Sequence, residues 1–352
     1  MQTKLLKIDR NEQDAADLSE ACELLRKGEL VAFPTETVYG LGGNACDATA
    51  SARIYAAKGR PSDNPLIVHI ADKKDLSVVG CDVSDGAKAL ADKFWPGPLT
   101  IIVKKSEIIP KETTGGLNTV AVRMPSDRIA NRLIAESGLF IAAPSANASG
   151  RPSTTRAEHC MEDLNGKVSM VIDGGAVQIG LESTIVDMST DKPLILRPGY
   201  ITLEMLKEII PDISYDPAVI AKVKNENVVA KAPGMKYRHY APKGEMTIYE
   251  GPVDLVINKI NEEVAKKQAE GKKVAVLATE ESKDFYKADV VKSLGRRTNE
   301  AEIAAHLFDV LRSFDEVEAD YIYGECFSVN GIGQAIMNRL MKAAGYHIIP
   351  LK

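Results

Sequence analysis

The sequence lacks the features that mark several large classes of protein. Its five cysteines are scattered at 22, 46, 81, 160 and 326 without a Cys-x-x-Cys pair, so neither a disulfide framework nor a structural zinc site is predicted. No apolar run approaches the ~18 residues that cross a bilayer. The N-terminus has no apolar stretch of signal-peptide length. We therefore expect a cytoplasmic protein with no membrane contact.

Common motifs for nucleotides, metals and nucleophiles are missing as well. There is no G-x-x-x-x-G-K-[ST] loop, no G-x-S-x-G elbow and no His or carboxylate cluster that suggests a protein-bound metal. The nearest dinucleotide pattern is "GIGQAI" at 331–336, where Ile336 replaces the third glycine. No acidic residue follows it at a suitable distance, so we interpret it as a helix start and predict no metal ligands.

What is present indicates a globular chain with room for two domains. It has 352 residues, of which 26% are charged and 45% hydrophobic. A net charge of −5 does not indicate nucleic-acid binding, although it leaves room for a local basic groove.

The pattern along the chain changes twice. Many short apolar strands and few helices predict a catalytic domain over 1–210, of mixed α/β (α+β-like) type. Helices are expected near 17–28 and 47–59, and "LVAFPTETVYGL" at 30–41 is expected to be one strand. Residues 211–245 carry four prolines and predict a linker. Strand–helix alternation over 246–352 predicts a small Rossmann-like, doubly wound domain.

Two cations flank a glycine at the expected end of the second helix. On a helix, Lys58 and Arg60 would diverge, but Gly59 leaves helical geometry easily and Pro61 favours an extended Arg60. In an extended turn both cations face one side, which suits an anionic ligand such as a polyphosphate. The alternative is a solvated helix end, where cations favour the C-terminal dipole.

Small polar residues recur at the expected strand ends. Thr35 and Thr37 would share one face of an extended segment, and Ser145 and Asn147 repeat this spacing after an apolar strand. Open α/β sheets bind ligands at such strand ends. Ordinary strand threonines and a plain turn are the respective alternatives.

An arginine lies inside a predicted strand. Arg123 in "NTVAVRMP" needs a partner or a ligand, because burying a lone cation is costly. A structural ion pair and a ligand contact both remain open. "GLEST" at 180–184 and "LRPG" at 196–199 also place polar groups beside apolar strands.

In order, "PTETVYGLG", "KGRPSDNPLIVHI", "AVRMPSD", "APSANASGRPS", "GLESTIVD" and "LRPG" resemble the YrdC-like family of L-threonylcarbamoyladenylate synthases. "APGMKYRHYAP" and the appended domain resemble the longer two-domain form. Each motif is modest, but six in register are highly specific, and the match covers essentially the whole chain. The linker motif "APGMKYRHYAP" begins with Ala232, at a position where the family also uses serine.

The resemblance implies a twisted, open mixed sheet with a concave cleft and a nucleotidyltransferase reaction in tRNA processing. L-Threonine, bicarbonate and ATP would give threonylcarbamoyl-AMP and pyrophosphate, for modification of the adenosine beside the anticodon. Mg²⁺ would be bound through ATP. A downstream tRNA threonylcarbamoyl-transferase complex would be a transient partner, and weak RNA binding is compatible with this function.

The family's functional residues carry over individually. Lys58 and Arg60 would be the catalytic polyphosphate clamp, and the linker would close over the cleft as a lid. The residues that would contact ATP are Lys58, Arg60, Asn64, Thr119, Ser145, Asn147, Ser153, Arg197, His239 and Tyr240. Those that would contact threonine are Thr37, His69, Arg123, Ala143 and Ser183, with Arg123 on the carboxylate.

Two other functions remain as alternatives. An RNA-binding module without catalysis is disfavoured by the acidic balance and by the lack of interleaved basic and aromatic residues. A carbamoyl-transfer domain of the same family would carry an acylphosphatase-like segment and zinc-type cysteine pairs, which are absent.

Overall fold

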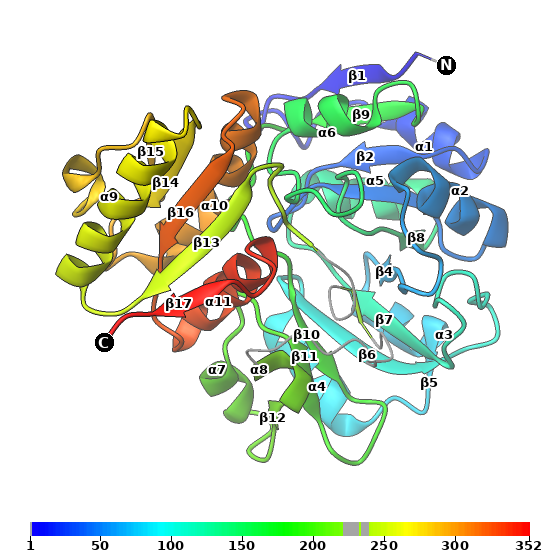
Figure 1. Cartoon of the computed structure of the whole chain (residues 1–352). Coiled ribbons are helices and arrows are strands. Elements are labelled where there is room, and N and C mark those ends of the chain that lie inside the picture. The colour runs from blue at the N-terminus through cyan, green and yellow to red at the C-terminus, as the bar shows by residue number, and fades with distance from the viewer. Residues whose placement is uncertain (1, 221–231, 234–238) are drawn as a thin grey trace. The chain divides into compact units, whose positions relative to one another are not determined.

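A computed structural model of the chain describes residues 2–220, 232–233 and 239–352 (Figure 1). The described residues form two compact units. The first holds 2–149, 153–220 and 232–233, and the second holds Gly150–Pro152 and 239–352. Much of the predicted linker, at 221–231 and 234–238, lies outside the described residues. Within the described part, no helix is both long enough and apolar enough to span a bilayer.

The first unit is built on a mixed sheet, which confirms the predicted fold class. The described residues contribute twelve strands in the order β1-β9-β2-β3-β8-β4-β7-β6-β10-β11-β12, with β5 paired to β6. Neighbours such as β4 and β7 run parallel, whereas β7 and β6 run antiparallel. The strands are β1 (Lys4–Lys7), β2 (Val31–Phe33), β3 (Gly40–Asn44), β4 (Ile67–His69), β5 (Gly80–Cys81), β6 (Leu99–Lys105), β7 (Thr119–Arg123), β8 (Ile141–Ala142), β9 (Met170–Asp173), β10 (Thr184–Asp187), β11 (Leu194–Arg197) and β12 (Ser214–Tyr215).

Helices bury both faces of this sheet. Alternation along β2 sends Ala32 into one buried cluster, and Val31 and Phe33 into another that includes residues of α1 and α5. The helices are α1 (Ser19–Arg26), α2 (Ala48–Lys58), α3 (Leu76–Val79), α4 (Asp85–Phe94), α5 (Arg128–Ser137), α6 (Ala157–Leu164), α7 (Leu203–Lys207) and α8 (Pro217–Ile220), with a 3₁₀ turn η1 (Lys73–Asp75).

Sequence patterns predicted most of these elements correctly. Apolar spacing and Gly28 located α1, whose Ala21, Cys22 and Leu25 are buried. The single strand predicted over 30–41 is wrong, because the chain turns between β2 and β3, which pair antiparallel. Strand β12 and helix α8 lie where no periodicity predicted an element.

The second unit is a smaller α/β domain, as predicted. Its described strands pair only in parallel, in the order β15-β14-β16-β13-β17. The strands are β13 (Glu245–Glu250), β14 (Val274–Ala278), β15 (Val290–Ser293), β16 (Tyr321–Glu325) and β17 (Ile348–Pro350). The helices are α9 (Val253–Ala269), α10 (Glu300–Glu316) and α11 (Gly331–Ala343), with a 3₁₀ turn η2 (Lys283–Phe285).

The glycine-rich segment of the second unit begins a helix, as predicted. Helix α11 starts at Gly331, and the N–H of Gly333 donates a hydrogen bond of 3.0 Å to Glu300 Oε2. A Cβ at Gly333 would lie 2.4 Å from the Ser328 carbonyl oxygen, so this position needs a glycine. The Glu300 carboxylate and the Ser328 carbonyl oxygen therefore both lie close to the start of this helix.

Candidate functional site

Neighbouring strands of the first unit align a row of polar side chains. His69 on β4 is in register with Arg123 on β7, which is in register with Thr100 on β6. Directly opposed residues share a face of the sheet, so these side chains emerge on the same side. The Thr100 and Ser183 hydroxyls lie 2.7 Å apart, and Arg197 Nη2 donates to Ser183 Oγ at 3.1 Å. We call His69, Arg123, Thr100, Ser183 and Arg197 the polar row.

The polar row contains four residues predicted from the sequence. It brings together His69, Arg123 and Ser183, which are expected around threonine, and Arg197, which is expected at ATP. Thr100 was missed, because a threonine within "LTIIVKK" has no pattern that distinguishes it from an ordinary strand residue. It joins the predicted residues through its hydrogen bond to Ser183.

His69 is a neutral member of the row. Its side chain is buried, and Nδ1 lies 3.1 Å from the carbonyl oxygen of Ile67. Burial, assisted by the positive charge of Arg123, lowers the pKa of His69 to about 3. The imidazole therefore contributes hydrogen bonds at neutral pH and adds no charge.

Arg123 has a buried carboxylate beside it. Its Nη2 lies 2.8 Å from Oε1 of Glu36, and the two side chains are 4% and 6% exposed. Its Nε lies 3.4 Å from the Gly97 carbonyl oxygen. The ion pair, one of the two alternatives, is thus present. Glu36 was missed, although it is the one carboxylate between Leu30 and Leu41.

The threonines next to Glu36 form a turn. Thr35 Oγ1 accepts hydrogen bonds from the N–H groups of Thr37 and Val38, at 3.1 and 3.2 Å. A threonine hydroxyl that captures backbone N–H groups in this way competes with strand pairing. The prediction of an extended segment is therefore wrong at this point, although the Thr35 and Thr37 hydroxyls do meet at 2.8 Å. The Thr37 carbonyl accepts from the N–H of Gly180 at 3.1 Å.

The two cations at the end of α2 are both buried. Gly59 caps the helix in the left-handed region with φ 63°, as its sequence position predicted. Lys58 Nζ donates to the carbonyl oxygens of Ser145 and Asn147. Arg60 donates to the carbonyl oxygens of Asn64 and Pro65, at 3.2 and 3.0 Å. A solvated helix end, the alternative considered above, does not describe either side chain.

Lys58 stabilises the loop that contains Ser145 and Asn147 through hydrogen bonds to its backbone. The N–H of Ser149 returns a hydrogen bond of 2.8 Å to the Lys58 carbonyl. Within the loop, Ser145 Oγ donates to Asn147 Oδ1 at 2.5 Å. Ala143 anchors its start, because its N–H donates to the Ile67 carbonyl at 2.8 Å. The structure thus connects the predicted residues of α2 to those of this loop.

The remaining predicted residues of the first unit have different surroundings. Asn64 is buried, and its Oδ1 accepts no hydrogen bond from any described residue. Thr119 shares a face of β7 with Arg123, four positions along the strand. Ser153 Oγ donates to Glu182 Oε1 at 2.5 Å. Glu182 was also missed, although it lies inside the quoted "GLEST" segment.

His239 and Tyr240 belong to the second unit. Their rings lie 5.5 Å apart, and the Tyr240 ring lies 5.1 Å from that of Phe308. Tyr240 is buried. Their expected contact with ATP stays a prediction.

One described residue of the predicted linker packs on the first unit's sheet. Ala232 is fully buried in a cluster with one residue from each of five strands, Ile67, Ile102, Ala121, Ile185 and Leu196. Ile67 and Ala121 precede His69 and Arg123 by two positions, so they lie on the same face. Ala232 therefore covers the sheet face that carries the polar row.

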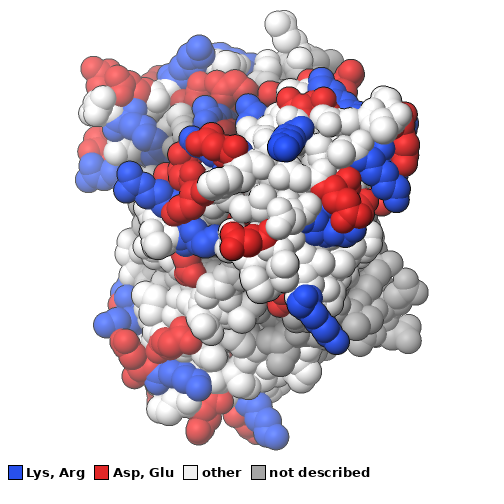
Figure 2. Space-filling model, turned by 60° about the vertical axis from the view of Figure 1, so that its left-hand side comes forward, with Lys and Arg blue, Asp and Glu red and all other residues white. Residues whose placement is uncertain are grey.

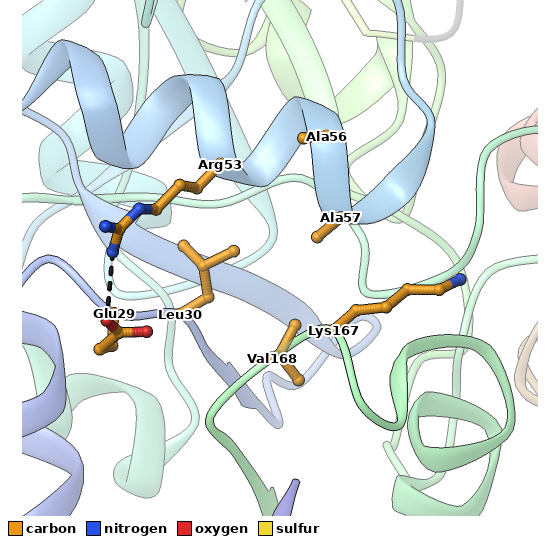
Figure 3. A pocket seen from close by; sticks show the side chains of 7 residues that line it. All are labelled: Glu29, Leu30, Arg53, Ala56, Ala57, Lys167 and Val168. Carbon is orange, nitrogen blue, oxygen red and sulfur yellow. Dashed lines mark hydrogen bonds and ion pairs between the residues drawn. The ribbon is translucent and has the colours of Figure 1, made fainter. Parts of the chain in front are cut away.

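A separate hollow of about 620 Å³ lies elsewhere on the first unit (Figure 3). It is lined by residues of α2 and by segments around Leu30 and Val168, and includes none of the predicted site residues. Its charged groups have partners: Arg53 pairs with Glu29 at 3.2 Å, and Lys167 Nζ donates to the Asp163 carbonyl. We assign it no role in the site.

Charges of both signs are interspersed on the face shown in Figure 2. Among the described residues visible there, Lys and Arg alternate with Asp and Glu, and there is no continuous basic area. This face does not resemble the positive surface that binds nucleic-acid backbones.

Comparison with known proteins gives matches to both units. A family described as "Telomere recombination" (Sua5, YciO and YrdC) matches residues 23–199. A second, described as "Threonylcarbamoyl-AMP synthase, C-terminal domain", matches 201–345. The threonylcarbamoyl-AMP synthase of Pyrococcus abyssi is 51% identical over 329 residues, 94% of each chain. That of Bacillus subtilis is 48% identical over 353 residues, 99% of this chain and 100% of the relative.

A solved structure gives the same result. The crystal structure of P. abyssi Sua5 complexed with L-threonine aligns with a TM-score of 0.93 at 48% identity. The alignment covers 99% of this chain and 100% of the other. The similarity thus extends through both units.

Proposed function

This chain belongs to the threonylcarbamoyl-AMP synthase family, and from that premise we propose how its own residues carry out the reaction. The chain makes L-threonylcarbamoyl-AMP and pyrophosphate from L-threonine, bicarbonate and ATP, for threonylcarbamoyl modification of tRNA. The observation that carries the proposal is the polar row. It gathers predicted threonine and nucleotide residues on one sheet face.

We place threonine at the end of the row that holds His69 and Arg123. The planar guanidinium fork of Arg123 suits the amino acid's carboxylate. His69 is neutral, so it provides a hydrogen-bonding partner for the substrate hydroxyl without repelling an ammonium group. Thr37, Ser183 and the backbone of Ala143 complete the predicted pocket.

We propose that ATP binds beside the end of α2. Lys58 and Arg60 neutralise the phosphates, and because their side chains also bind backbone carbonyls, the loops at 145–147 and 64–65 are ordered with them. Asn64 Oδ1 is an acceptor that no described residue uses, which suits an adenine or ribose donor. Thr119, Ser145, Asn147, Ser153, Arg197, His239 and Tyr240 are the further predicted contacts.

The chemistry needs positioning and charge stabilisation. The threonine amine attacks bicarbonate or CO₂, and the carbamate then attacks the α-phosphorus of ATP while pyrophosphate leaves. In this proposal Lys58 and Arg60 stabilise the charge that develops on the phosphates. We propose that Mg²⁺ accompanies ATP, because a magnesium site often uses substrate phosphates more than protein ligands.

The linker serves as the lid in this proposal. Carbamate and mixed anhydride both react with water, so the site gains from exclusion of solvent. Ala232, buried on the sheet face of the polar row, supports this role. We further propose a cytoplasmic location and delivery of the adenylate to a downstream tRNA-modifying enzyme.

A pyrophosphate assay tests the proposal directly. The full chain is incubated with ATP and Mg²⁺ under three conditions: with threonine and bicarbonate, with serine in place of threonine, and without bicarbonate. We expect release that needs both threonine and bicarbonate. Release that is indifferent to both would reject the proposed use of these substrates.

A further inference from the structure

Three buried atoms beside Thr37 make no hydrogen bond to any described residue. They are Oε1 and Oε2 of Glu36 and Nη2 of Arg123. Nη2 lies within ion-pair distance of Oε1, at 2.8 Å, but that contact does not have hydrogen-bond geometry. Buried polar atoms are nearly always hydrogen-bonded, so three such atoms side by side require an explanation.

The unsatisfied atoms are of complementary kinds. Arg123 offers a donor, and the Glu36 carboxylate offers acceptors. A single ligand that presents an acceptor and several donors on neighbouring groups would satisfy all three. An α-amino acid does so, because its carboxylate and its ammonium group are attached to the same carbon.

Glu36 differs from the neighbouring carboxylate of Asp127, because its own oxygens accept no hydrogen bond from any described residue. Asp127, whose pKa is raised mainly by burial and also by the nearby charge of Glu36, accepts from Arg10 Nη1 at 3.0 Å and from the N–H of Ala130 at 3.1 Å. Both oxygens of Asp127 are therefore occupied by the protein. The backbone of Glu36 is fixed, because its carbonyl accepts from the N–H of Ile179 at 2.9 Å.

We propose that Glu36 binds the ammonium group of threonine and, with Arg123, makes the pocket selective for a zwitterionic amino acid. This rests on the proposed function, in which Arg123 receives the substrate carboxylate. Arg123 then faces the negative carboxylate of the ligand, and Glu36 faces its positive ammonium group. A carboxylic acid without the amine would leave the Glu36 oxygens buried and unsatisfied, which is costly.

Titration calorimetry on the full chain tests the assignment with two ligands. L-Threonine carries carboxylate, hydroxyl and ammonium groups, and 3-hydroxybutyrate lacks only the ammonium. We expect wild type to bind threonine at least tenfold more tightly than 3-hydroxybutyrate. In Glu36→Gln, threonine binding should weaken at least about tenfold. Binding of 3-hydroxybutyrate should stay equal or tighten, because the charge of Arg123 is less compensated.

Two outcomes would overturn the proposal. Equal weakening of both ligands in Glu36→Gln would mean that Glu36 only orients Arg123. Equal affinity of wild type for both ligands would mean that the pocket has no ammonium site. This comparison uses only the wild-type chain, so it does not depend on the folding of a variant. Asp127→Asn is the matched control, and it should leave the preference for threonine unchanged. Failure of wild type to bind threonine at all would instead refute the proposed substrate site.

Discussion

Two buried carboxylates, one in each unit, have opposite surroundings. Glu325, at the end of β16 in the second unit, accepts from Ser282 Oγ, from Tyr286 OH at 2.8 Å and from Arg297 Nη2. Glu36 in the first unit lies beside an arginine too, but accepts no hydrogen bond from any residue that the structure describes. The comparison separates a carboxylate that completes a fold from one that is left ready for a ligand.

The contrast extends to the sheets that hold these residues. The second unit has a regular parallel sheet, whose strand ends are closed by its own side chains. The first unit has a mixed sheet in which short strands end in turns, such as the one at Thr35. Irregular ends allow residues from several strands to converge, and unsatisfied groups are tolerated where a substrate completes them.

The strongest test of the comparison removes the closed carboxylate. Glu325→Ala leaves Ser282, Tyr286 and Arg297 without their acceptor, so we expect a loss of about 3 kcal/mol in unfolding free energy with an unchanged KM for threonine. The single tryptophan, Trp95, lies in the first unit and reports its unfolding by fluorescence. The unfolding of the second unit, followed by circular dichroism, should therefore occur at a lower urea concentration than in wild type. The unfolding of the first unit, followed by Trp95 fluorescence, should keep its wild-type midpoint. A raised KM would show that the two carboxylates do not differ in role.

The second test removes the cations of the first unit. Lys58→Ala and Arg60→Ala should each lower kcat at least about 100-fold, the scale for losing one donor to a transition state. Initial rates of pyrophosphate release measure this, and thermal unfolding checks that the loops remain folded. The exposed Lys88→Ala is the control and should keep the wild-type rate. Near-normal turnover in both variants would contradict the clamp.

The third test uses the buried imidazole of the polar row. The pKa of His69 is lowered to about 3, so the unfolded chain binds the proton first as pH falls below the ordinary value of 6.5. The contribution of His69 is thus complete above pH 6.5 and is lost on acidification towards pH 3. Protonation of His69 in the unfolded chain should lower the unfolding free energy by about 2 kcal/mol when the pH falls from 7 to 5. Urea unfolding of wild type and His69→Asn at both pH values measures it; an equal pH dependence would argue against a neutral buried His69.

The smallest expected effect concerns the lid. Ala232→Asp places a charge among Ile67, Ile102 and Ala121, so the segment should leave the sheet face. We expect about a tenfold loss in threonine-dependent product, with more AMP formed per product, because water reaches the threonylcarbamoyl-AMP anhydride and cleaves it to AMP and the carbamate, which decomposes to threonine and CO₂. Chromatographic quantification of AMP against threonylcarbamoyl-AMP gives this ratio. An unchanged ratio would mean that Ala232 only packs on the sheet and has no part in excluding water.

Local sequence signals predicted much of the fold for physical reasons. Apolar spacing located α1, and Gly59 marked the end of α2, because each signal acts within a few residues. The strand over 30–41 failed because the Thr35 hydroxyl takes backbone N–H groups that strand pairing would use. Strand β12 has two residues, too few for any periodicity to show.

The candidate site was predictable only in part. Family motifs named Arg123, His69 and Ser183, and the strand register brings these together. Thr100 enters the row through pairing between distant segments, which no local pattern contains. Glu36 lies within its motif, but the extended segment expected there directed attention to Thr35 and Thr37, and Glu36 received no role. Tertiary contacts, and not composition, give these two residues their importance.

The helix start at Gly331 has a negative charge of the chain beside it. Its first turn has the glycine spacing of a phosphate cradle, yet Glu300 already holds the N–H of Gly333. A phosphate group arriving there would meet a resident negative charge and would have to displace it. The second unit thus occupies the N-terminus of α11 with a carboxylate of its own, at the place where an anion would otherwise bind.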